Sequence, residues 1–455
     1  MAEQAKAAGS GTYLGALWGM GESMVAYASS ALGYEDFKVI DPNAKEAKQG
    51  DAAVDEGVHG EMRKQTWGSN QFQQYIGMDV TSLLSVPVWI MEPVTILQKA
   101  SEIMQYTELL DKASECNDKF ERFAYVAAYL VSPFGGAERA WKPFNPILGE
   151  TFEIEVGNGV KFLAEQVSHH PPVAACHAEN EHFLYDIVSA PTTRFLGNSL
   201  EVFPHGRTRI TLRKHNELYT QVPPNLMAHN IVLGKSWIDV FGTLTVVCPT
   251  TGVRCELEFK PCGWFGYGRY EFVGYVCDAD GAKKIKLFGK WNSHVDMLPC
   301  GLDGEPPVDA EPTRMWTCSP KPKGDYYGFT TFAHVVSSSE GIKEPLASDS
   351  RRRADRAHLY KGETGPAGTA KHQLEEMQRA EKRERDANGG SWVPRWFRKV
   401  EEPELFEGDA PLDKVPFWEW NGEHSKLLEA KPGNAEEIEG KGFCPWQFPD
   451  LHASS

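Results

Sequence analysis

Residues 165–172 of the chain read Glu165-Gln166-Val167-Ser168-His169-His170-Pro171-Pro172. Two adjacent imidazoles are followed by two prolines, which fix φ and lack a backbone N–H group, so the histidines are excluded from a helix interior. Upstream, after the turn Gly157-Asn158-Gly159, the apolar residues at 160, 162 and 164 alternate with Lys161, Leu163 and Glu165. This pattern predicts a hairpin strand that runs into the histidine pair and places the pair at a strand end.

The chemistry of the histidine pair allows three interpretations. The pair could belong to a proline-rich rim with partly exposed rings, to a metal site, or to a site for an anion. A hydrolase or metalloenzyme built on this stretch would use Glu165, Ser168, His169 and His170. Spacing argues against such an enzyme, because adjacent histidines do not readily converge on one metal and the two prolines do not form the strand-to-helix elbow of a serine nucleophile.

Composition limits the classes of function. The chain has 455 residues, enough for two or three domains or one large all-β unit. Its 47 Lys and Arg against 63 Asp and Glu give a net charge of −16, which argues against nonspecific nucleic-acid binding. Residues 351–400 are an exception, with thirteen Lys and Arg against seven Asp and Glu. Any site for an anion must therefore be local.

Cysteine usage and the N-terminus indicate the compartment. Nine cysteines occur without any C-x-x-C pair, at positions 116, 176, 248, 255, 262, 277, 300, 318 and 444. An odd number without zinc-ligand spacing indicates reduced thiols. The first dozen residues are polar and rich in Gly and Ala, with no basic stretch leading into an apolar core, so we expect no secretory signal and a cytosolic protein.

The N-terminal stretch 13–32 has a helical stripe of bulky apolar residues opposite small uncharged ones. The apolar side carries Leu14, Leu17, Trp18 and Val25. This predicts an amphipathic segment at 1–34 that contacts loosely packed lipid, or else packs as a core helix or as a lid over a cavity of the protein itself. Residues 35–66 lack periodic apolar content and read as a flexible linker. We expect the folded domain at 67–400, and a C-terminal extension at 401–455 whose aromatic residues pack back on it.

Helices and a rigid turn precede a long β region. Pro93 suits the first position of a helix that runs to about residue 110, and a second helix is predicted from 120 to 130. The following turn carries Lys142 and Asn145 beside prolines, so a charge and an amide can face one target. From 151 to about 300, short alternating runs between turn residues predict an antiparallel meander, folded as a sandwich or as a barrel wide enough for a ligand.

Residues 371–385 are strongly helix-forming, and Lys371, Glu375 and Arg379 follow one another at i+4 spacing on one face. Apolar content on this helix is thin, so it must lie on a surface or find partners for its charges. A solvated charged face is the alternative interpretation.

Three of these segments together resemble the lipid-binding domain of the oxysterol-binding protein family. They are EQVSHHPP at 165–172, KPFNPILGE at 142–150 and the K-x-x-L-E-E-x-Q-R run at 371–379, in the family's order and spacing. Weaker agreement covers EPVTILQKASEI from residue 92, DSRRR from 349 and W-x-P-R-W-F from 392. The chain is most similar to short plant-type members that lack a pleckstrin-homology domain.

The resemblance implies an α+β, mainly β fold, a large nearly closed antiparallel β-barrel around a lipid tunnel with an N-terminal lid helix and packed outer helices. It implies a monomeric lipid-transfer protein that exchanges a sterol or phosphatidylserine for phosphatidylinositol 4-phosphate, performs no chemistry and needs no cofactor or metal. Such a protein would be cytoplasmic and would contact the endoplasmic reticulum and other organelle membranes peripherally. A sensor that binds the same lipids without moving them is the alternative.

By the same resemblance, the phosphorylated head group would be held by Lys142, Asn145, His169, His170, Lys371 and Arg379, with Glu375 orienting the basic side chains. Residue chemistry agrees, since a multiply charged phosphate requires several converging cations. Ala354 replaces the family's proline after the DSRRR run and is expected to loosen the approach to the helix that follows. The tail segment Glu404-Leu405-Phe406-Glu407 has a distant similarity to motifs that bind an endoplasmic-reticulum receptor. A leucine stands where an aromatic is expected, and an acidic tail without that role is the other interpretation.

Overall fold

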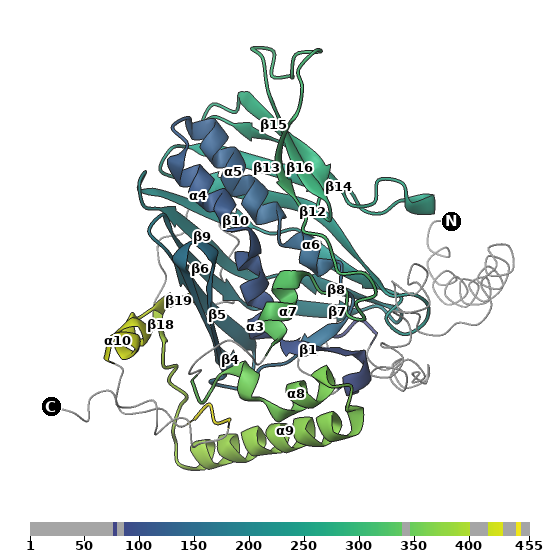
Figure 1. The fold of residues 1–455 in the computed structure, drawn as a ribbon, viewed down its shortest axis with the longest axis vertical. Coiled ribbons are helices and arrows are strands. Elements are labelled where there is room, and N and C mark those ends of the chain that lie inside the picture. Colours follow the sequence, from purple (N-terminus) through teal and green to yellow (C-terminus); the bar gives the residue numbers. More distant parts are fainter. Residues whose placement is uncertain (1–75, 80–85, 339–345, 401–416, 431–442, 447–455) are drawn as a thin grey trace, which may run out of the picture.

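The computed structural model describes residues 76–79, 86–338, 346–400, 417–430 and 443–446. The expected lid helix, with Leu14, Leu17, Trp18 and Val25, lies outside these residues, and so do the linker at 35–66 and the tail segment 404–407. One large antiparallel sheet dominates the described part, with helices packed against it (Figure 1). The mainly β α+β architecture expected from the sequence is confirmed.

The large sheet has a main path of twelve strands, joined in the order β17-β16-β15-β14-β13-β12-β10-β9-β6-β5-β4-β3. Their bounds are β3 Thr151–Val156, β4 Val160–His169, β5 Pro172–Glu179, β6 Phe183–Ser189, β9 Gly206–Leu212, β10 Glu217–Val222, β12 Trp237–Cys248, β13 Val253–Phe259, β14 Glu271–Cys277, β15 Lys283–Lys290, β16 His294–Pro299 and β17 Thr313–Thr317. Within the described ranges, the path begins at β17 and ends at β3, and no ladder is found between these two strands.

Three further strands branch from β12, namely β7 Thr192–Phe195, β8 Ser199–Phe203 and β11 Asn225–His229. The first half of β12 pairs with β11 from Trp237 to Phe241, and the second half pairs with β13 from Gly242 onward. Gly242 has φ +95° at this junction, a conformation that a residue with a Cβ adopts only with strain. The glycine therefore lets one strand serve both the branch and the main path.

The helices are α3 Ile96–Ser101, α4 Glu108–Glu115, α5 Lys119–Val131, α6 Phe134–Ala137, α7 Thr331–Ser337, α8 Ala354–Tyr360, α9 Thr364–Ala387 and α10 Glu423–Ala430. The expected helix start at Pro93 is wrong. Pro93 lies in β1 Met91–Thr95, and α3 begins after Thr95, whose side chain and backbone form a capping box with Gln98. The capping box provides acceptors for the backbone N–H groups of Thr95 and Gln98. A helix that began at Pro93 would lack these side-chain acceptors.

Helix α5 fills the space beside the sheet. It packs against β13 to β17, while α4 packs against β6 and β9 (Figure 1). Small and large apolar residues are buried around most of its circumference, from Phe123 to Val131, as expected for a helix enclosed on several sides. Its polar exception, Arg122, reaches Glu217 of β10 with an N–O separation of 2.6 Å. This ion pair joins the helix to the sheet on the side away from β17.

The C-terminal part of the described chain lies against the outer face of β5 and β6. Strand β18 Phe397–Val400 pairs with β19 Phe417–Trp420, and α10 follows. The Trp420 ring stacks on His177 of β5 with a centroid distance of 4.9 Å, and Phe417 and Trp396 are buried in an apolar cluster with residues of β4 to β6. The aromatic density of the tail is thus used for packing.

Candidate functional site

The turn at 142–150 begins at β2 Lys142–Phe144, which pairs in parallel with β1. The Lys142 ammonium donates to the Asn145 side-chain oxygen at 2.7 Å, so the charge and the amide that the sequence singled out are in direct contact. At the end of the turn, the Glu150 carboxylate accepts the Ile147 backbone N–H at 2.9 Å. Hydrogen bonds at both ends thus fix the conformation of this turn.

Arg353 attaches the turn to the segment that leads into α8. Its guanidinium donates to the Glu150 carboxylate and to the Asn145 carbonyl, each at 2.9 Å, and pairs with Asp355 at 2.6 Å. The three charged groups are buried. An ion pair at this depth is strongly destabilised when one partner is removed, because the other charge is left in a medium that solvates it poorly. Arg353 is therefore a positioning residue for the turn.

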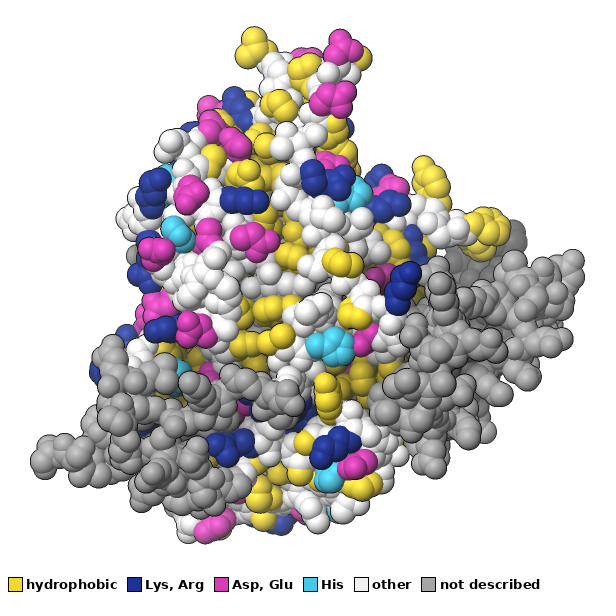
Figure 2. Space-filling view, in the orientation of Figure 1, with side chains coloured by type: hydrophobic (Ala, Val, Ile, Leu, Met, Phe, Trp, Pro, Cys, Tyr) yellow, Lys and Arg dark blue, Asp and Glu magenta, His cyan; other side chains and the backbone are white. Residues whose placement is uncertain are grey.

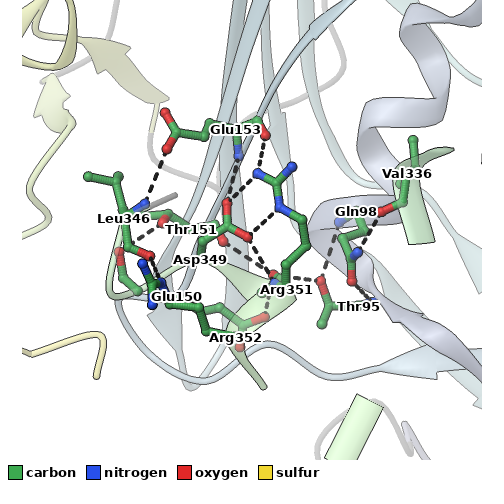
Figure 3. A network of polar contacts seen from close by, with 12 residues as sticks. Thr95, Gln98, Glu150, Thr151, Glu153, Val336, Leu346, Asp349, Arg351 and Arg352 are labelled. Atoms are coloured by element: carbon green, nitrogen blue, oxygen red, sulfur yellow. Dashed lines mark hydrogen bonds and ion pairs between the residues drawn. The ribbon is translucent and has the colours of Figure 1, made fainter. Parts of the chain in front are cut away.

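The neighbouring residues 349–352 extend this network into the sheet (Figure 3). Asp349 accepts the Arg351 backbone N–H at 2.8 Å and the Arg351 guanidinium at 2.7 Å. Ser350 donates to Glu150 at 2.6 Å and contacts Thr95, the cap of α3, at 2.9 Å. The DSRRR run thus ties the turn, α3 and β3 together, and it gives α8 and α9 a fixed starting point.

The histidine pair stands at the hairpin between β4 and β5, as the sequence predicts. His169 is the last residue of β4 and lies opposite Pro172, the first residue of β5, while His170 occupies the turn between them. The two rings are in edge-to-face contact, with centroids 4.7 Å apart. His169 is half-buried and His170 is exposed. Neighbouring side chains point to opposite faces only within a strand. Because His170 lies in the turn and not in β4, its ring can contact the ring of His169.

Helix α9 brings the remaining charges to this hairpin and turn. The expected helix at 371–385 is confirmed and is longer, from Thr364 to Ala387. Lys371 pairs with Glu375 at 2.7 Å, and Arg379 approaches the other Glu375 oxygen at 3.6 Å while also pairing with Glu376. Glu375 therefore lies between two cations of the same helix face, as the i+4 spacing requires.

Gln378 joins all three segments, and its role was missed in the sequence. Its side-chain oxygen accepts the Leu148 backbone N–H at 2.8 Å, and its side-chain nitrogen lies 2.7 Å from His169 Nε2. The Leu148 donor fixes the amide orientation, so the Gln378 N–H donates to an unprotonated His169 Nε2. A signal was present, since Gln378 is three residues after Glu375 and shares its helix face.

Burial is the main cause of the pKa shifts at this site, and neighbouring positive charge is the second. Burial, and then the charge of Lys371, lower the pKa of Lys142 to about 8, against a partial opposing effect of Glu375. Burial, and then the neighbouring His170, lower the pKa of His169 to about 4. At neutral pH, His169 is therefore an uncharged hydrogen-bonding group, and Lys142, Lys371 and Arg379 bring positive charge to its surroundings.

The structure brings together Lys142, Asn145, His169, His170, Lys371, Glu375 and Arg379 from a turn, a hairpin and a helix. Glu165 is not part of this group. It is fully buried, where burial raises its pKa to about 7, and it accepts the backbone N–H groups of Arg395 and Trp396 at 2.8 Å each. Ser168 donates to the Pro171 carbonyl at 2.7 Å.

A serine hydrolase on this stretch would need hydrogen bonds that join Ser168 and Glu165 to a histidine. In the structure, both side chains hydrogen-bond to backbone groups, so this geometry is not formed. Among the described residues, no group of three or more His, Cys, Asp or Glu side chains could hold a metal ion.

A comparison with known families decides the relationship. The model of the family described as oxysterol-binding protein matches residues 68–427. The chain belongs to the oxysterol-binding protein family. Proteins of this family bind and transfer lipids and are not enzymes. The three segments that meet at the site are those that carry the resemblance in the sequence.

Relatives within the oxysterol-binding protein family support this assignment over most of the chain. Oxysterol-binding protein-related protein 3C of Arabidopsis thaliana is 42% identical over 425 residues, which cover 92% of each chain. Related protein 3B of the same plant is 41% identical and covers 95% of this chain and 94% of its own. Human oxysterol-binding protein-related protein 1 is 34% identical over 77% of this chain and 40% of its own length.

Solved structures of similar fold carry lipids. The Osh1 ORD domain in complex with ergosterol is 27% identical, with a TM-score of 0.71 over 88% of this chain and 100% of that domain. The Osh3 ORD of Saccharomyces cerevisiae in complex with PI(4)P is 25% identical, with a TM-score of 0.62 over 80% of this chain and 91% of that one. Within the ranges that the structure describes, no helix combines the length and apolar character needed to cross a bilayer.

Proposed function

We propose that this protein is a lipid-transfer protein that carries a sterol, or phosphatidylserine, and phosphatidylinositol 4-phosphate in turn, and exchanges them between membranes. The phosphorylated inositol binds where β2, the β4–β5 hairpin and α9 meet. The observation that carries the proposal is the convergence of Lys142, Lys371 and Arg379 with the histidine pair on an otherwise acidic chain. The solved relatives with ergosterol and with PI(4)P support both kinds of cargo.

The electrostatics of the site favour a phosphate. Burial, and then repulsion from the Lys371 ammonium, lower the pKa of Lys142. A phosphate monoester carries a charge close to −2 at neutral pH and offers three acceptor oxygens, so it relieves this repulsion and accepts from both ammonium groups. Asn145 and His170, both exposed, offer further hydrogen bonds at the same place. Glu375 pairs with Lys371 and lies close to Arg379, so it holds both cations on one face of α9.

The proposal includes where the protein works. A cytoplasmic carrier would attach peripherally to the endoplasmic reticulum and to other organelle membranes, as a single chain. Attachment to an endoplasmic-reticulum receptor would use the tail segment 404–407. Both proposals go beyond the family assignment. Imaging the protein in cells, with and without residues 404–407, tests them.

Extraction from vesicles tests the head-group assignment. Full-length protein with His169→Ala and His170→Ala should lose extraction of phosphatidylinositol 4-phosphate, because the hairpin wall of the site is removed. Extraction of sterol from matched vesicles should stay at the wild-type level, since the sterol has no phosphate to bind there. Phosphoinositide extraction at the wild-type level by this variant would overturn the assignment.

A further inference from the structure

The loop between β13 and β14 displays three aromatic rings to solvent. Trp264, Phe265 and Tyr267 are 85%, 104% and 85% exposed. The loop extends from one side of the sheet, and apolar side chains project from this edge of the surface (Figures 1 and 2). Aromatic residues gain most from leaving water, so a row of fully exposed rings indicates a surface that is covered when the protein works.

Hydrogen bonds hold the loop in this conformation. The Gly263 N–H donates to the Tyr267 carbonyl at 2.8 Å, and the Cys262 N–H donates to the Asp239 carboxylate at 2.8 Å. Phe265 has φ +60°, in the left-handed region that is rare for a bulky side chain. A bulky residue adopts this strained backbone conformation only where the surrounding structure requires it. Strained residues of this kind cluster at functional sites.

A second apolar cluster, which we call the rim, lies on two neighbouring turns and the segment 76–79. It consists of the exposed residues Ile76, Met78, Leu196 and Leu233. Asn198 of the β7–β8 turn accepts the Leu233 N–H of the β11–β12 turn at 2.8 Å and donates to the Leu233 carbonyl at 3.0 Å. The Phe195 N–H donates to the Met78 carbonyl at 3.1 Å. These bonds hold the rim in one place.

Trp237 connects the β13–β14 loop to the rim. It is the first residue of β12 and follows the β11–β12 turn. The Arg269 guanidinium of the β13–β14 loop lies over the Trp237 ring at 4.6 Å. On the strand beside it, His229 stacks on Trp237 with centroids 4.1 Å apart. His229 in turn pairs with Ser199, next to the Asn198 turn. The exposed aromatic rings and the aliphatic rim are therefore linked through the Trp237 end of β12.

The charges of this surface differ from those of other exposed apolar loops. Residues 260–270 contain two basic and no acidic side chains, and residues 230–236 contain Lys235 and no acidic side chain. At its base, Lys260 pairs with Glu271 at 3.2 Å. The β16–β17 loop at 300–312, by contrast, exposes Leu302 and Val308 fully but carries four acidic side chains. The β13–β14 loop and the β11–β12 turn can therefore meet a lipid surface without desolvating a carboxylate of their own, whereas the β16–β17 loop cannot. In the rim, the one acidic side chain of the segment 76–79 is Asp79, whose carboxylate accepts the Thr193 N–H and hydroxyl.

We propose that the β13–β14 loop inserts its aromatic residues into the bilayer interface while the rim rests on the same surface. Trp264 and Tyr267 have an apolar body and a polar group, the combination that settles at the level of lipid head groups. Phe265, which is fully apolar, occupies the apex and enters the acyl chains. The inference rests on the proposed function, since a carrier that extracts lipids has to meet a bilayer, and it names the structural element that does so.

Vesicle flotation with the full-length protein tests the loop. In Trp264→Ser/Phe265→Asn, both rings are removed, and asparagine suits the left-handed backbone at 265. Binding to phosphatidylcholine vesicles with a minor fraction of phosphatidylserine should fall at least about tenfold, because two interfacial aromatic side chains no longer leave water. The matched control, Leu302→Ser/Val308→Ser, removes equally exposed residues from the acidic loop and should bind as wild type does. Wild-type binding by the loop variant overturns the proposal, and so does equal loss in both variants.

A second measurement separates this proposal from the head-group assignment. A water-soluble, short-chain phosphatidylinositol 4-phosphate should bind the loop variant with wild-type affinity, because the loop contributes no residue to that site. His169→Ala/His170→Ala should show the converse, with weak binding of the soluble lipid and normal flotation. Loss of soluble-lipid binding in the loop variant would mean that the substitutions disturb the fold, and would refute a role confined to the membrane. If the loop binds a protein instead, flotation of the loop variant stays at the wild-type level.

Discussion

Replacing Gln378 with alanine removes the side chain that joins the turn, the hairpin and α9. Two hydrogen bonds are lost, one from the buried Leu148 N–H and one to His169. Each such bond contributes about 0.5–1.5 kcal/mol, and a buried donor left without a partner costs about 1–3 kcal/mol. We expect the free energy of unfolding to fall by about 2–3 kcal/mol, measured by urea denaturation.

The same change should weaken head-group binding without abolishing it. The cations remain, but His169 and the turn must be ordered by the ligand instead of by the amide. A cost of about 1.4 kcal/mol for this ordering corresponds to a tenfold rise in the Kd of short-chain phosphatidylinositol 4-phosphate. Isothermal titration calorimetry measures this Kd directly, on wild type and variant at equal pH and salt.

Gln378→Glu is the matched control, since it keeps an acceptor for the Leu148 N–H. The new carboxylate lies beside His169, raises the pKa of that imidazole and adds a negative charge where the phosphate binds. Stability should stay within about 1 kcal/mol of wild type, while affinity falls further than in the alanine variant. Wild-type stability and affinity in Gln378→Ala would refute the bridging role, and undiminished affinity in Gln378→Glu would refute an anion site at this position.

Three further predictions concern pH, helix α8 and the C-terminal tail. Because the pKa of Lys142 is lowered to about 8, its charge is lost as pH rises above that value, and the Kd of the soluble phosphoinositide should rise by up to about tenfold between pH 8 and 9. Titrations from pH 7 to 9 check this, and Lys142→Ala should remove the slope, because the phosphate itself does not titrate there. Ala354→Pro should raise the free energy of unfolding by about 0.4–1 kcal/mol. Ala354 is exposed and is the first residue of α8, a position that suits proline, and the preceding Arg353 already has the extended backbone that proline requires, with ψ 125°. A lower urea midpoint would contradict that expectation. Glu165→Gln should lower the free energy of unfolding, measured by urea denaturation, by about 1–3 kcal/mol. The carboxylate accepts the N–H groups of both Arg395 and Trp396, whereas the oxygen of an amide can accept only one of them. An unchanged urea midpoint would show that the tail is held by its aromatic packing alone.

Much of the fold was predictable because its signals are local. Alternation of apolar residues and the Gly and Asn turns gave the strands, and the proline pair placed His169 at the end of β4. The i+4 spacing placed Lys371, Glu375 and Arg379 on one helix face, as the structure has them. The helix start after Thr95 was missed because a proline that suits a first turn also suits an edge strand, and only the tertiary pairing with β2 selects the strand.

The connections within the site were not predictable in the same way. Nothing in the local pattern shows that Arg353 reaches the Asn145 carbonyl, 208 residues away, or that Gln378 reaches His169 across 209 residues. These contacts depend on how α8 packs against β1 and α9 packs against α8, and so does the lowered pKa of His169. The sequence pointed to an anion site at the histidine pair as one option, whereas burial leaves His169 neutral, so that the positive charge beside it comes from Lys142, Lys371 and Arg379.

Lipid exchange between two populations of vesicles tests the central claim most directly. Donor vesicles contain a fluorescent sterol and acceptor vesicles contain phosphatidylinositol 4-phosphate, with a separate reporter for each lipid. The account predicts that the full-length protein moves both lipids in opposite directions, that phosphoinositide in the acceptor accelerates sterol delivery, and that His169→Ala/His170→Ala removes the acceleration. Binding of either lipid without movement of the other, or acceleration that survives in the histidine variant, would contradict it.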